Sequence, residues 1–267
     1  YLVQVNGRYD GSSRFPKDDR FAFFPTFSLG WRLSQEKFWK PIAHIVNDFK
    51  IRGSYGLVGS DAFASGAPHF LYQNNIGIGS AHKFWTGLPT SEISKQGPGF
   101  YVLAVQDAGW EHVKKFDIGF DMMLFNQLNI TFDYFHDKRE RILMSRASWP
   151  SMLGYWGSKP WSNIGEVENQ GFELSLNWTK QFGKDLTLDL RGNFTYNQNE
   201  YKYVDEPSYP YVWQTNTGKP LNTVKGYIAE GLFASEEEIA NSPDQSQLGA
   251  NIMPGDIKYR DINGDGQ

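Results

Sequence analysis

The feature that most constrains the fold of this chain is a strict alternation of apolar and polar residues. In the clearest stretch, residues 171–197, nearly every second side chain is apolar on both sides of a short polar break. A period of two places the apolar side chains on one face of a β-strand and the polar side chains on the other. The pattern recurs at 1–9, 21–33, 48–58, 115–125 and 128–137. We therefore predict an all-β chain with seven two-faced strands.

The connections between these strands alternate in length. Short or medium connections at 34–48, 125–127 and 180–185 separate long ones, which occupy 10–20, 59–111, 138–168 and the chain from 198 onward. In an antiparallel sheet every second connection lies at the same end, so we expect all the long connections at one end. Outer-membrane β-barrels have this asymmetry, with short periplasmic turns and long extracellular loops.

Strand length and aromatic residues indicate what the apolar face contacts. The opening strands have about 10 residues or more, which suits the ~9–11 residues that a tilted strand needs to cross a bilayer. Phe172, Phe194 and Tyr196 lie near the long-loop end of the apolar face, and Trp178 lies near a short turn. Aromatic girdles of this kind mark the two membrane interfaces of a barrel. The pattern predicts that the apolar face contacts lipid.

The polar face is then predicted to line a water-filled lumen. The inward charges would be Lys50, Arg52, Asp117, Asp121, Glu173, Asp189 and Arg191. Seven strands cannot close a barrel, and an open sheet edge in lipid leaves backbone groups unpaired. We therefore expect part of a large antiparallel transmembrane β-barrel. Residues 1–198 would supply seven barrel strands and 199–267 a long extracellular loop, while the plug and the closing strands would lie outside this chain.

Composition and motifs argue against several other classes of protein. A formal net charge of −4 provides no basic stripe, so no nucleic-acid partner is expected. The chain has no cysteine, and it contains no nucleophile elbow, P-loop or His-Glu-x-x-His motif. We therefore expect no enzymatic activity and no catalytic residues. The alternative to a barrel is a soluble carbohydrate-binding or structural β-domain, because such domains also have alternating strands.

The chain resembles the SusC/RagA-like TonB-dependent transporters of bacterial outer membranes in seven stretches that follow one consistent order. They are RYDGSSRF (8–15), FFPTFSLGWRLSQEKF (23–38), KIRGSYGLVGS (50–60), GWEHVKKFDIGFDMMLFNQLNITFDYFHDKRERIL (109–143), NIGEVENQGFELSLNW (163–178), GKPLNTVKGYIAEGLFASEEEI (218–239) and PGDIKYRDINGDG (254–266). No single stretch is decisive, but the ordered set is specific.

This resemblance implies a plugged barrel of about 22 strands in the bacterial outer membrane, with the lipid bilayer around it. It implies import of bulky nutrients, which are oligosaccharides or, in some members, peptides. A SusD-like surface lipoprotein would cover the extracellular mouth. The TonB system would supply energy through the N-terminal part that is absent here. Which nutrient is carried stays open.

Aromatic residues in the long connections are the candidates for substrate binding. The densest cluster, SWPSMLGYWGSKPWSN at 148–163, contains Trp149, Tyr155, Trp156 and Trp161. Aromatic rings present large apolar faces that can stack on sugar rings, and they equally pack loops together or bind a protein lid. We take these four residues as candidates for substrate contact, with loop packing and lipoprotein contact as the alternatives.

The last loop carries two further motifs. SEEE at 235–238 is a capping box that predicts a short helix. DINGDG at 261–266 places Asp261, Asn263 and Asp265 at the first, third and fifth positions of a calcium loop, with Gly266 at the sharp turn. The bidentate carboxylate of such a loop would lie past the end of this chain. The alternative is a turn whose side chains cap their own backbone, but we expect a structural Ca²⁺ here.

Overall fold

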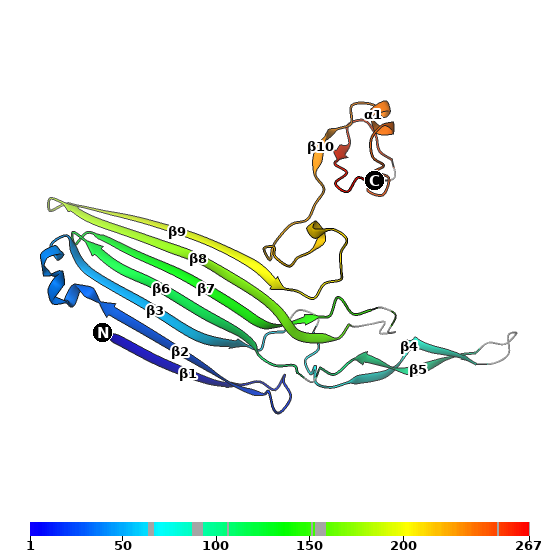
Figure 1. Cartoon of the computed structure of the whole chain (residues 1–267), viewed down its shortest axis with the longest axis horizontal. Coiled ribbons are helices and arrows are strands. Elements are labelled where there is room, and N and C mark those ends of the chain that lie inside the picture. The colour runs from blue at the N-terminus through cyan, green and yellow to red at the C-terminus, as the bar shows by residue number, and fades with distance from the viewer. Residues whose placement is uncertain are drawn as a thin grey trace. The chain divides into compact units, whose positions relative to one another are not determined.

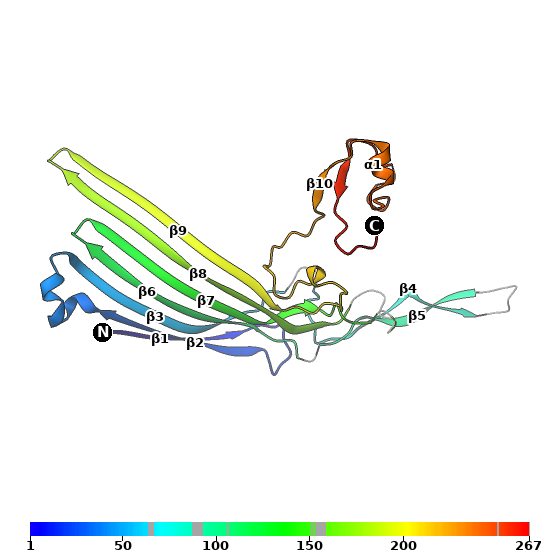
Figure 2. The ribbon, with the colours of Figure 1, turned by 45° about the horizontal axis from the view of Figure 1, so that its top comes forward.

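The computed structural model describes residues 1–63, 67–86, 93–105, 107–150, 152, 159–249 and 251–266. The chain divides into two compact units, Tyr1–Leu221 and Asn222–Gln267, which we describe separately. The first unit is built on an antiparallel sheet of seven strands whose order in space is their order in the chain. Figures 1 and 2 show these strands side by side in a curved sheet, from β1 in blue to β9 in yellow.

The seven strands are β1 (Leu2–Gly11), β2 (Phe21–Arg32), β3 (Val46–Ser60), β6 (Glu111–Leu124), β7 (Leu128–Ser145), β8 (Trp161–Phe182) and β9 (Leu186–Tyr203). Each strand pairs with the next one in antiparallel register. The 3₁₀ helices η1 (Leu33–Gln35) and η2 (Lys37–Ile42) lie between β2 and β3, and η4 (Val212–Gln214) follows β9. The predicted all-β fold with seven paired strands is confirmed.

Three strands extend much further than the alternation predicts. β7 has 18 residues, β8 has 22 and β9 has 18. The connection expected at 138–168 is therefore confined to 146–160, and β9 continues past the boundary expected at 198. Backbone pairing persists in these extensions, but polar and charged side chains replace the apolar ones on the outer side. Without apolar members, a period of two gives no sequence signal.

The connection from β3 to β6 contains a hairpin that the sequence analysis did not predict. Strands β4 (Asn75–Thr86) and β5 (Ile93–Val102) pair with each other as a separate two-stranded sheet. Figure 1 shows this hairpin extending away from the seven strands at their long-loop end. Glycines, among them Gly77 and Gly97, hold positions where a strand pattern needs large side chains.

The buried core of the first unit lies at the long-loop end of the sheet. One cluster contains Leu71, Val105, Ala108 and Leu143, and another contains Phe15, Phe24 and Trp110. The buried Asn163 side chain ties two chain segments together, because its Nδ2 donates to the carbonyl oxygens of Gly109 (3.0 Å) and Arg141 (2.8 Å). These contacts give the loops a fixed base.

The second unit contains strands β10 (Ala229–Leu232) and β11 (Ile257–Tyr259), which pair with each other, and helix α1 (Glu236–Ala240). Ser235 Oγ accepts a hydrogen bond from the Glu238 N–H at 3.2 Å, which confirms the predicted helix start. The Glu238 carboxylate accepts from the N–H of Ala234 at 2.8 Å, one residue before the position expected in a capping box. No helix in the described part of the chain has the length and apolarity to cross a bilayer.

Candidate functional site

The strand register brings the predicted apolar residues onto one face of the seven-stranded sheet, which we call the outer face. One row across this face, from β1 to β9, consists of Val3, Leu29, Gly53, Ile118, Tyr134, Phe172 and Tyr196. Large apolar side chains on the outer face are exposed, with Val5 at 71%, Phe23 at 59% and Phe194 at 55%. A continuous exposed apolar face of this extent marks a surface that another apolar medium covers.

Aromatic rings form a continuous row across the outer face. Ring centroids lie 5.8 Å apart from Phe49 to Phe120, 5.6 Å from Phe120 to Phe132, and 6.0 Å from Phe132 to Phe172. Contacts of this kind stabilise neighbouring strands by about 0.5–1.5 kcal/mol each beyond their buried area. They connect β3, β6, β7 and β8 through side chains as well as through the backbone.

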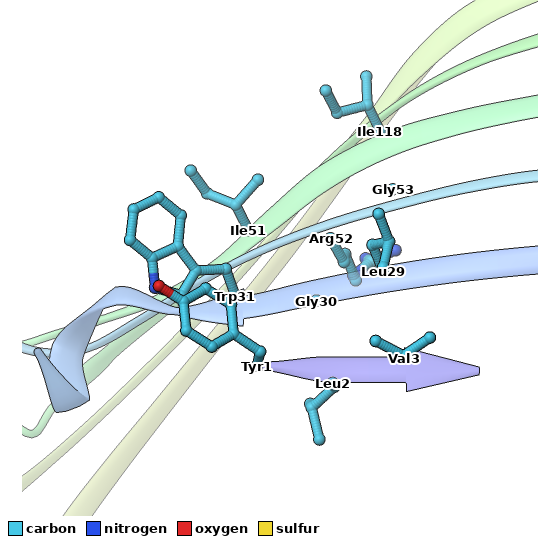
Figure 3. A pocket seen from close by; sticks show the side chains of 10 residues that line it. All are labelled: Tyr1, Leu2, Val3, Leu29, Gly30, Trp31, Ile51, Arg52, Gly53 and Ile118. Carbon is cyan, nitrogen blue, oxygen red and sulfur yellow. The ribbon is translucent and has the colours of Figure 1, made fainter.

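The outer face continues to the first strand of the sheet. Figure 3 shows the rings of Tyr1 and Trp31 next to each other, with Ile51 and Ile118 on the neighbouring strands. The two ring centroids are 5.7 Å apart. These four side chains help to line an apolar hollow, so the outer face is apolar at β1, β2, β3 and β6 as well.

The opposite face, which we call the inner face, carries a charge cluster around Arg52. The Arg52 guanidinium lies 2.7 Å from Asp133 Oδ2, 3.4 Å from Asp121 Oδ2 and 3.5 Å from Asp117 Oδ1. One side chain of β3 therefore bridges to carboxylates of β6 and β7. Lys50 adds a contact of 3.7 Å to Asp121. The predicted inward charges of these strands do share one face, and Asp133, which the sequence analysis did not single out, joins them.

The remaining predicted inward charges lie on the same face by register. Glu173 pairs with Asp133, Asp189 pairs with Thr179, and Arg191 pairs with Asn177. The inner face therefore remains polar from β3 to β9. Such a face can line a hydrated passage, whereas burying it in hydrocarbon would be strongly unfavourable.

Asp205 connects two chain segments at the long-loop end. The residue is 8% exposed, and its carboxylate accepts hydrogen bonds from the Ser148 N–H (2.9 Å) and the Ser148 hydroxyl (2.8 Å). Arg146 Nε lies 3.3 Å away. Burial alone would raise the pKa of Asp205, but the hydrogen bonds from Ser148 and the charge of Arg146 outweigh it and lower that pKa. This contact fixes the start of the β7–β8 connection against the segment after β9.

The predicted aromatic candidates are distributed unevenly in the structure. Trp161 is the first residue of β8 and packs against the cluster of Leu71, Val105, Ala108 and Leu143, so it participates in loop packing. Trp149 is partly buried, and its backbone N–H donates to the carbonyl of Arg146 at 3.2 Å. Tyr155 and Trp156 lie outside the described residues. Substrate contact by these four residues stays a prediction.

A second aromatic group lies in the segment after β9. Tyr211 and Trp213 stack with ring centroids 4.4 Å apart, and Trp213 is 45% exposed. Lys219 Nζ donates to the Trp213 carbonyl at 2.7 Å, and Glu206 accepts from the Thr217 N–H at 3.1 Å. The sequence analysis did not select this pair, because the spacing of two aromatic residues in a loop does not reveal that they stack.

The predicted calcium loop folds as a compact turn. Asp261 accepts hydrogen bonds from the N–H groups of Asn263 (3.1 Å), Gly264 (2.7 Å) and Gly266 (2.9 Å). Gly266 has a φ of 85°, which suits the sharp turn expected there. These are the hydrogen bonds of a turn that caps its own backbone. The hydrogen bond from the Gly266 N–H, followed by those of the other backbone donors, lowers the pKa of Asp261. Among the described residues, no group of three or more His, Asp or Glu side chains is arranged to hold a metal ion, and calcium binding by this loop stays a prediction.

Together, the exposed apolar outer face, the charged inner face and the strand order define a segment of transmembrane β-barrel wall. The chain belongs to the family described as TonB dependent receptor-like, beta-barrel, whose family model matches residues 1–251. The resemblance to SusC/RagA-like transporters that the sequence motifs carry is thereby confirmed.

Individual relatives agree with this family. TonB-dependent receptor P3 of Formosa agariphila is 28% identical over 281 residues, which cover 100% of this chain and 26% of that protein. TonB-dependent receptor SusC of Bacteroides thetaiotaomicron is 30% identical over 212 residues, covering 75% of this chain and 19% of that protein. The chain thus spans a minor part of the length of the curated relatives that it matches.

A solved structure shows the same fold. The structure of the RagAB peptide importer in the 'closed-closed' state superposes with a TM-score of 0.65 at 19% identity, over 97% of this chain and 27% of that chain. The curved seven-stranded sheet is therefore the fold of a large barrel protein, of which this chain covers a portion.

Proposed function

We propose that this chain forms part of the wall of an outer-membrane importer that takes up bulky nutrients with energy from the TonB system. The observation that carries the proposal is the two-faced sheet. Its outer face exposes large apolar side chains such as Val5 and Phe194, and its inner face holds charges such as Arg52 and Asp133. A wall with these faces separates lipid from a hydrated passage.

The soluble β-domain, which is the alternative function, does not explain the outer face. A soluble domain of this size would cover most of its large apolar side chains with a second layer. Here the buried apolar side chains gather at the long-loop end, and the apolar band between the two ends of the sheet is exposed. The exposed band favours a membrane protein.

The cargo and the partner of the importer are also part of the proposal. We infer oligosaccharides or peptides as cargo and a SusD-like lipoprotein over the long-loop end, because SusC and the RagAB peptide importer are similar proteins. The sequence candidates Trp149, Tyr155, Trp156 and Trp161, together with the exposed Trp213, would provide aromatic contacts for either. A structural Ca²⁺ held by Asp261, Asn263 and Asp265 would stabilise the loop that contains them.

An uptake assay tests this function. The gene for the full-length protein is deleted in its host, and uptake of labelled oligosaccharides and of labelled peptides is measured, with the wild-type gene returned as the control. Uptake of one of these classes should be lost on deletion, restored by the wild-type gene and abolished by a protonophore. Unchanged uptake of both classes, or uptake that resists the protonophore, would refute the proposal.

Purification tests the partner separately. Gentle detergent extraction of the full-length protein from its native membrane should yield a stoichiometric surface lipoprotein. If the barrel is recovered without one, the inferred lid is wrong even where the uptake result is positive.

A further inference from the structure

The connection between β2 and β3 differs from the other connections at the short-turn end of the sheet. The β6–β7 and β8–β9 connections are tight turns at 125–127 and 183–185, whereas residues 33–45 form the two 3₁₀ helices η1 and η2. Figures 1 and 2 show this segment in blue, next to the N-terminus, as a compact coil at that end of the sheet. We call residues 33–45 the foot.

Two tryptophans hold the foot against the outer face of the sheet. Trp31 of β2 donates its Nε1–H to the Glu36 carboxylate at 3.0 Å. Trp39 stacks on Phe49 of β3, with ring centroids 5.3 Å apart and 6° between the ring planes, and its Nε1–H donates to the Val46 carbonyl at 3.0 Å. Because Trp31 and Phe49 belong to the outer face, the foot is folded toward the lipid side of the wall.

The stack on Phe49 also gives the depth of the foot. Val46 is the first residue of β3, so Phe49 lies three residues above the lower end of that strand. This is about 8 Å along the membrane normal for a strand tilted by about 40°. The ring of Trp39 therefore lies beside the apolar face of the sheet, and the foot lies at the edge of the hydrocarbon.

Hydrogen bonds to neighbouring segments give the foot a fixed shape. The backbone N–H of Phe125, in the β6–β7 turn, donates to the Ile45 carbonyl at 2.9 Å, and Asn47 Nδ2 donates to the Ala43 carbonyl at 3.0 Å. A ligand that binds the foot therefore does not have to order its backbone, which lowers the entropic cost of binding.

The foot exposes large apolar side chains. Phe38 is 61% exposed, Ile42 is 43% exposed and Ile45 is 40% exposed, and Phe125 of the adjacent turn, at 57%, extends the same end of the outer face. Exposed apolar side chains that continue a lipid-facing surface suit the boundary between acyl chains and headgroups.

Two exposed cations accompany these apolar side chains. Lys37 and Lys40 are exposed, and among the residues that the structure describes no carboxylate lies within ion-pair distance of either. The carboxylates of the segment have other partners, since Glu36 accepts from Trp31 and Asp48 pairs with Arg32 at 2.7 Å. Lysines at such a boundary extend their ammonium groups toward the headgroups, where anionic lipids attract them.

We propose that the foot binds an anionic phospholipid of the leaflet at the short-turn end. Phe38 and Ile42 enter the acyl boundary, and the ammonium groups of Lys37 and Lys40 hold the anionic headgroup. Continuity with the outer face through Trp39 and the two uncompensated charges favour this occupant over a protein surface. The inference rests on the proposed function in that the outer face contacts lipid.

Fluorescence quenching by spin-labelled lipids tests the proposal. The chain has no cysteine, so Gln35→Cys introduces a unique thiol into this part of the full-length protein. The labelled protein is reconstituted into phosphatidylcholine vesicles that contain increasing fractions of phosphatidylglycerol or of phosphatidylcholine with a nitroxide near the top of one acyl chain. Ile118→Cys, on the outer face of β6, is labelled in the same way and tested with a mid-chain nitroxide lipid as the control for lipid contact.

The charges are removed in the Gln35→Cys background. Lys37→Gln with Lys40→Gln removes both cations of the foot. Lys180→Gln with Lys184→Gln is the matched control, because it removes the same charge at the β8–β9 turn of the same sheet end.

The expected result is selective quenching at position 35. The fraction of nitroxide lipid that halves the fluorescence should be about fivefold lower for phosphatidylglycerol than for phosphatidylcholine, since each lysine near an anionic surface favours it by about that factor. Lys37→Gln with Lys40→Gln should abolish the difference while leaving quenching by phosphatidylcholine, and the matched control should preserve it.

Three results would overturn the inference alone, provided that the label at 118 is quenched. They are equal quenching at 35 by the two lipids with all lysines present, equal loss of selectivity in both double variants, and no quenching at 35 by either lipid, which would mean that protein covers the foot. Absence of quenching at 118 would overturn the lipid-facing role of the outer face, and the proposed function with it.

Discussion

Leu176 offers the most direct test of the orientation of the sheet. It lies on the outer face of β8 between Phe172 and Phe182, and it is 38% exposed. The stretch from Phe172 to Phe182 rises by about 25 Å along the membrane normal at a tilt of about 40°, which equals the apolar band of a barrel. Leu176 therefore lies within about 3 Å of the midplane of that band.

The substitution Leu176→Arg places a charge near the centre of the lipid. Arginine at the midplane destabilises barrels by about 2–4 kcal/mol, and the cost falls to about 0–1 kcal/mol near the interfaces. Leu188 pairs with Lys180, which already places a charge on this face, with Nζ over the Phe182 ring at 5.2 Å from its centroid. We therefore expect Leu188→Arg to cost only about 1 kcal/mol, because it lies near the short-turn interface.

The matched control is the neighbouring residue on the opposite face. Ser175 lies on the inner face of β8, so Ser175→Arg adds the same side chain where water and charges surround it. All three variants are made in the full-length protein, and the free energy of unfolding is measured by urea titration in lipid vesicles. We expect the costs to rank Leu176, then Leu188, then Ser175. Equal costs at positions 175 and 176 would refute the assignment of the two faces.

Three further predictions concern the loops and the second unit. Because the pKa of Asp205 is lowered, its contact with Ser148 should persist above the ordinary carboxylate pKa of about 3.9 and be lost as the pH falls through the lowered value. Amide hydrogen exchange at Ser148, corrected for its intrinsic pH dependence, should therefore accelerate only in acid. In the Asp205→Asn variant the Ser148 amide should exchange fast at every pH. Equal exchange rates in the wild type and the variant at neutral pH would contradict this. Ser235→Ala should cost helix α1 about 1 kcal/mol, seen as faster exchange of the Glu238 amide, and an unchanged rate would mean that the cap does not stabilise the helix. The double substitution Asp261→Ala and Asp265→Ala should remove one calcium ion per full-length protein in calorimetric titration without changing uptake, and an unchanged calcium content would leave a plain turn.

The two faces of the sheet could be predicted because the alternation within each strand is enough to assign its residues to one face or the other. Phe172, Leu174 and Leu176 need no knowledge of the neighbouring strand to be assigned to one side, since the period of two is a local property. The charges at Arg52 and Asp117 follow from the same rule. The contact of Arg52 with Asp133 could not be predicted, because pairing across strands depends on register, which loops of variable length do not specify.

The upper parts of β7, β8 and β9 could not be predicted for a physical reason. Above the lipid, the outside of the wall is wet, so Lys138 and Glu168 take the positions that Phe and Leu hold lower down. Both faces are then polar, and a strand with two polar faces has the composition of a loop. One signal remained in the sequence: residues 136, 138 and 140 continue the two-residue spacing of 130, 132 and 134, which places them on the same face.

The loop end shows a different limit. Trp161 could be proposed for substrate contact because it belongs to a dense aromatic cluster in a long connection, yet it packs on a core whose members Leu71 and Val105 are distant in sequence. Tertiary packing of this kind has no local pattern. The same holds for Asp205, whose partner Ser148 precedes it by 57 residues and whose partner Arg146 lies earlier still.

The course of the apolar band across the sheet gives an independent measure of strand tilt. Val3 on β1 and Tyr196 on β9 lie in one row of paired residues, yet on β1 the outer face stays apolar up to Tyr9. From β9 to β1, the upper limit of the apolar band therefore shifts by about six residues across about six interstrand steps. This is a shift of ~20 Å along the strands over ~29 Å across them.

A climb of about one residue per strand corresponds to a strand tilt of about 35°. Closed membrane barrels have strands tilted by about 35–45°. In a soluble sandwich the apolar band does not have to shift evenly from strand to strand, because the second layer can pack on an apolar area of any shape. The stagger therefore shows that a flat slab of lipid, crossed by tilted strands, determined where Phe, Leu and Tyr were placed along this sequence.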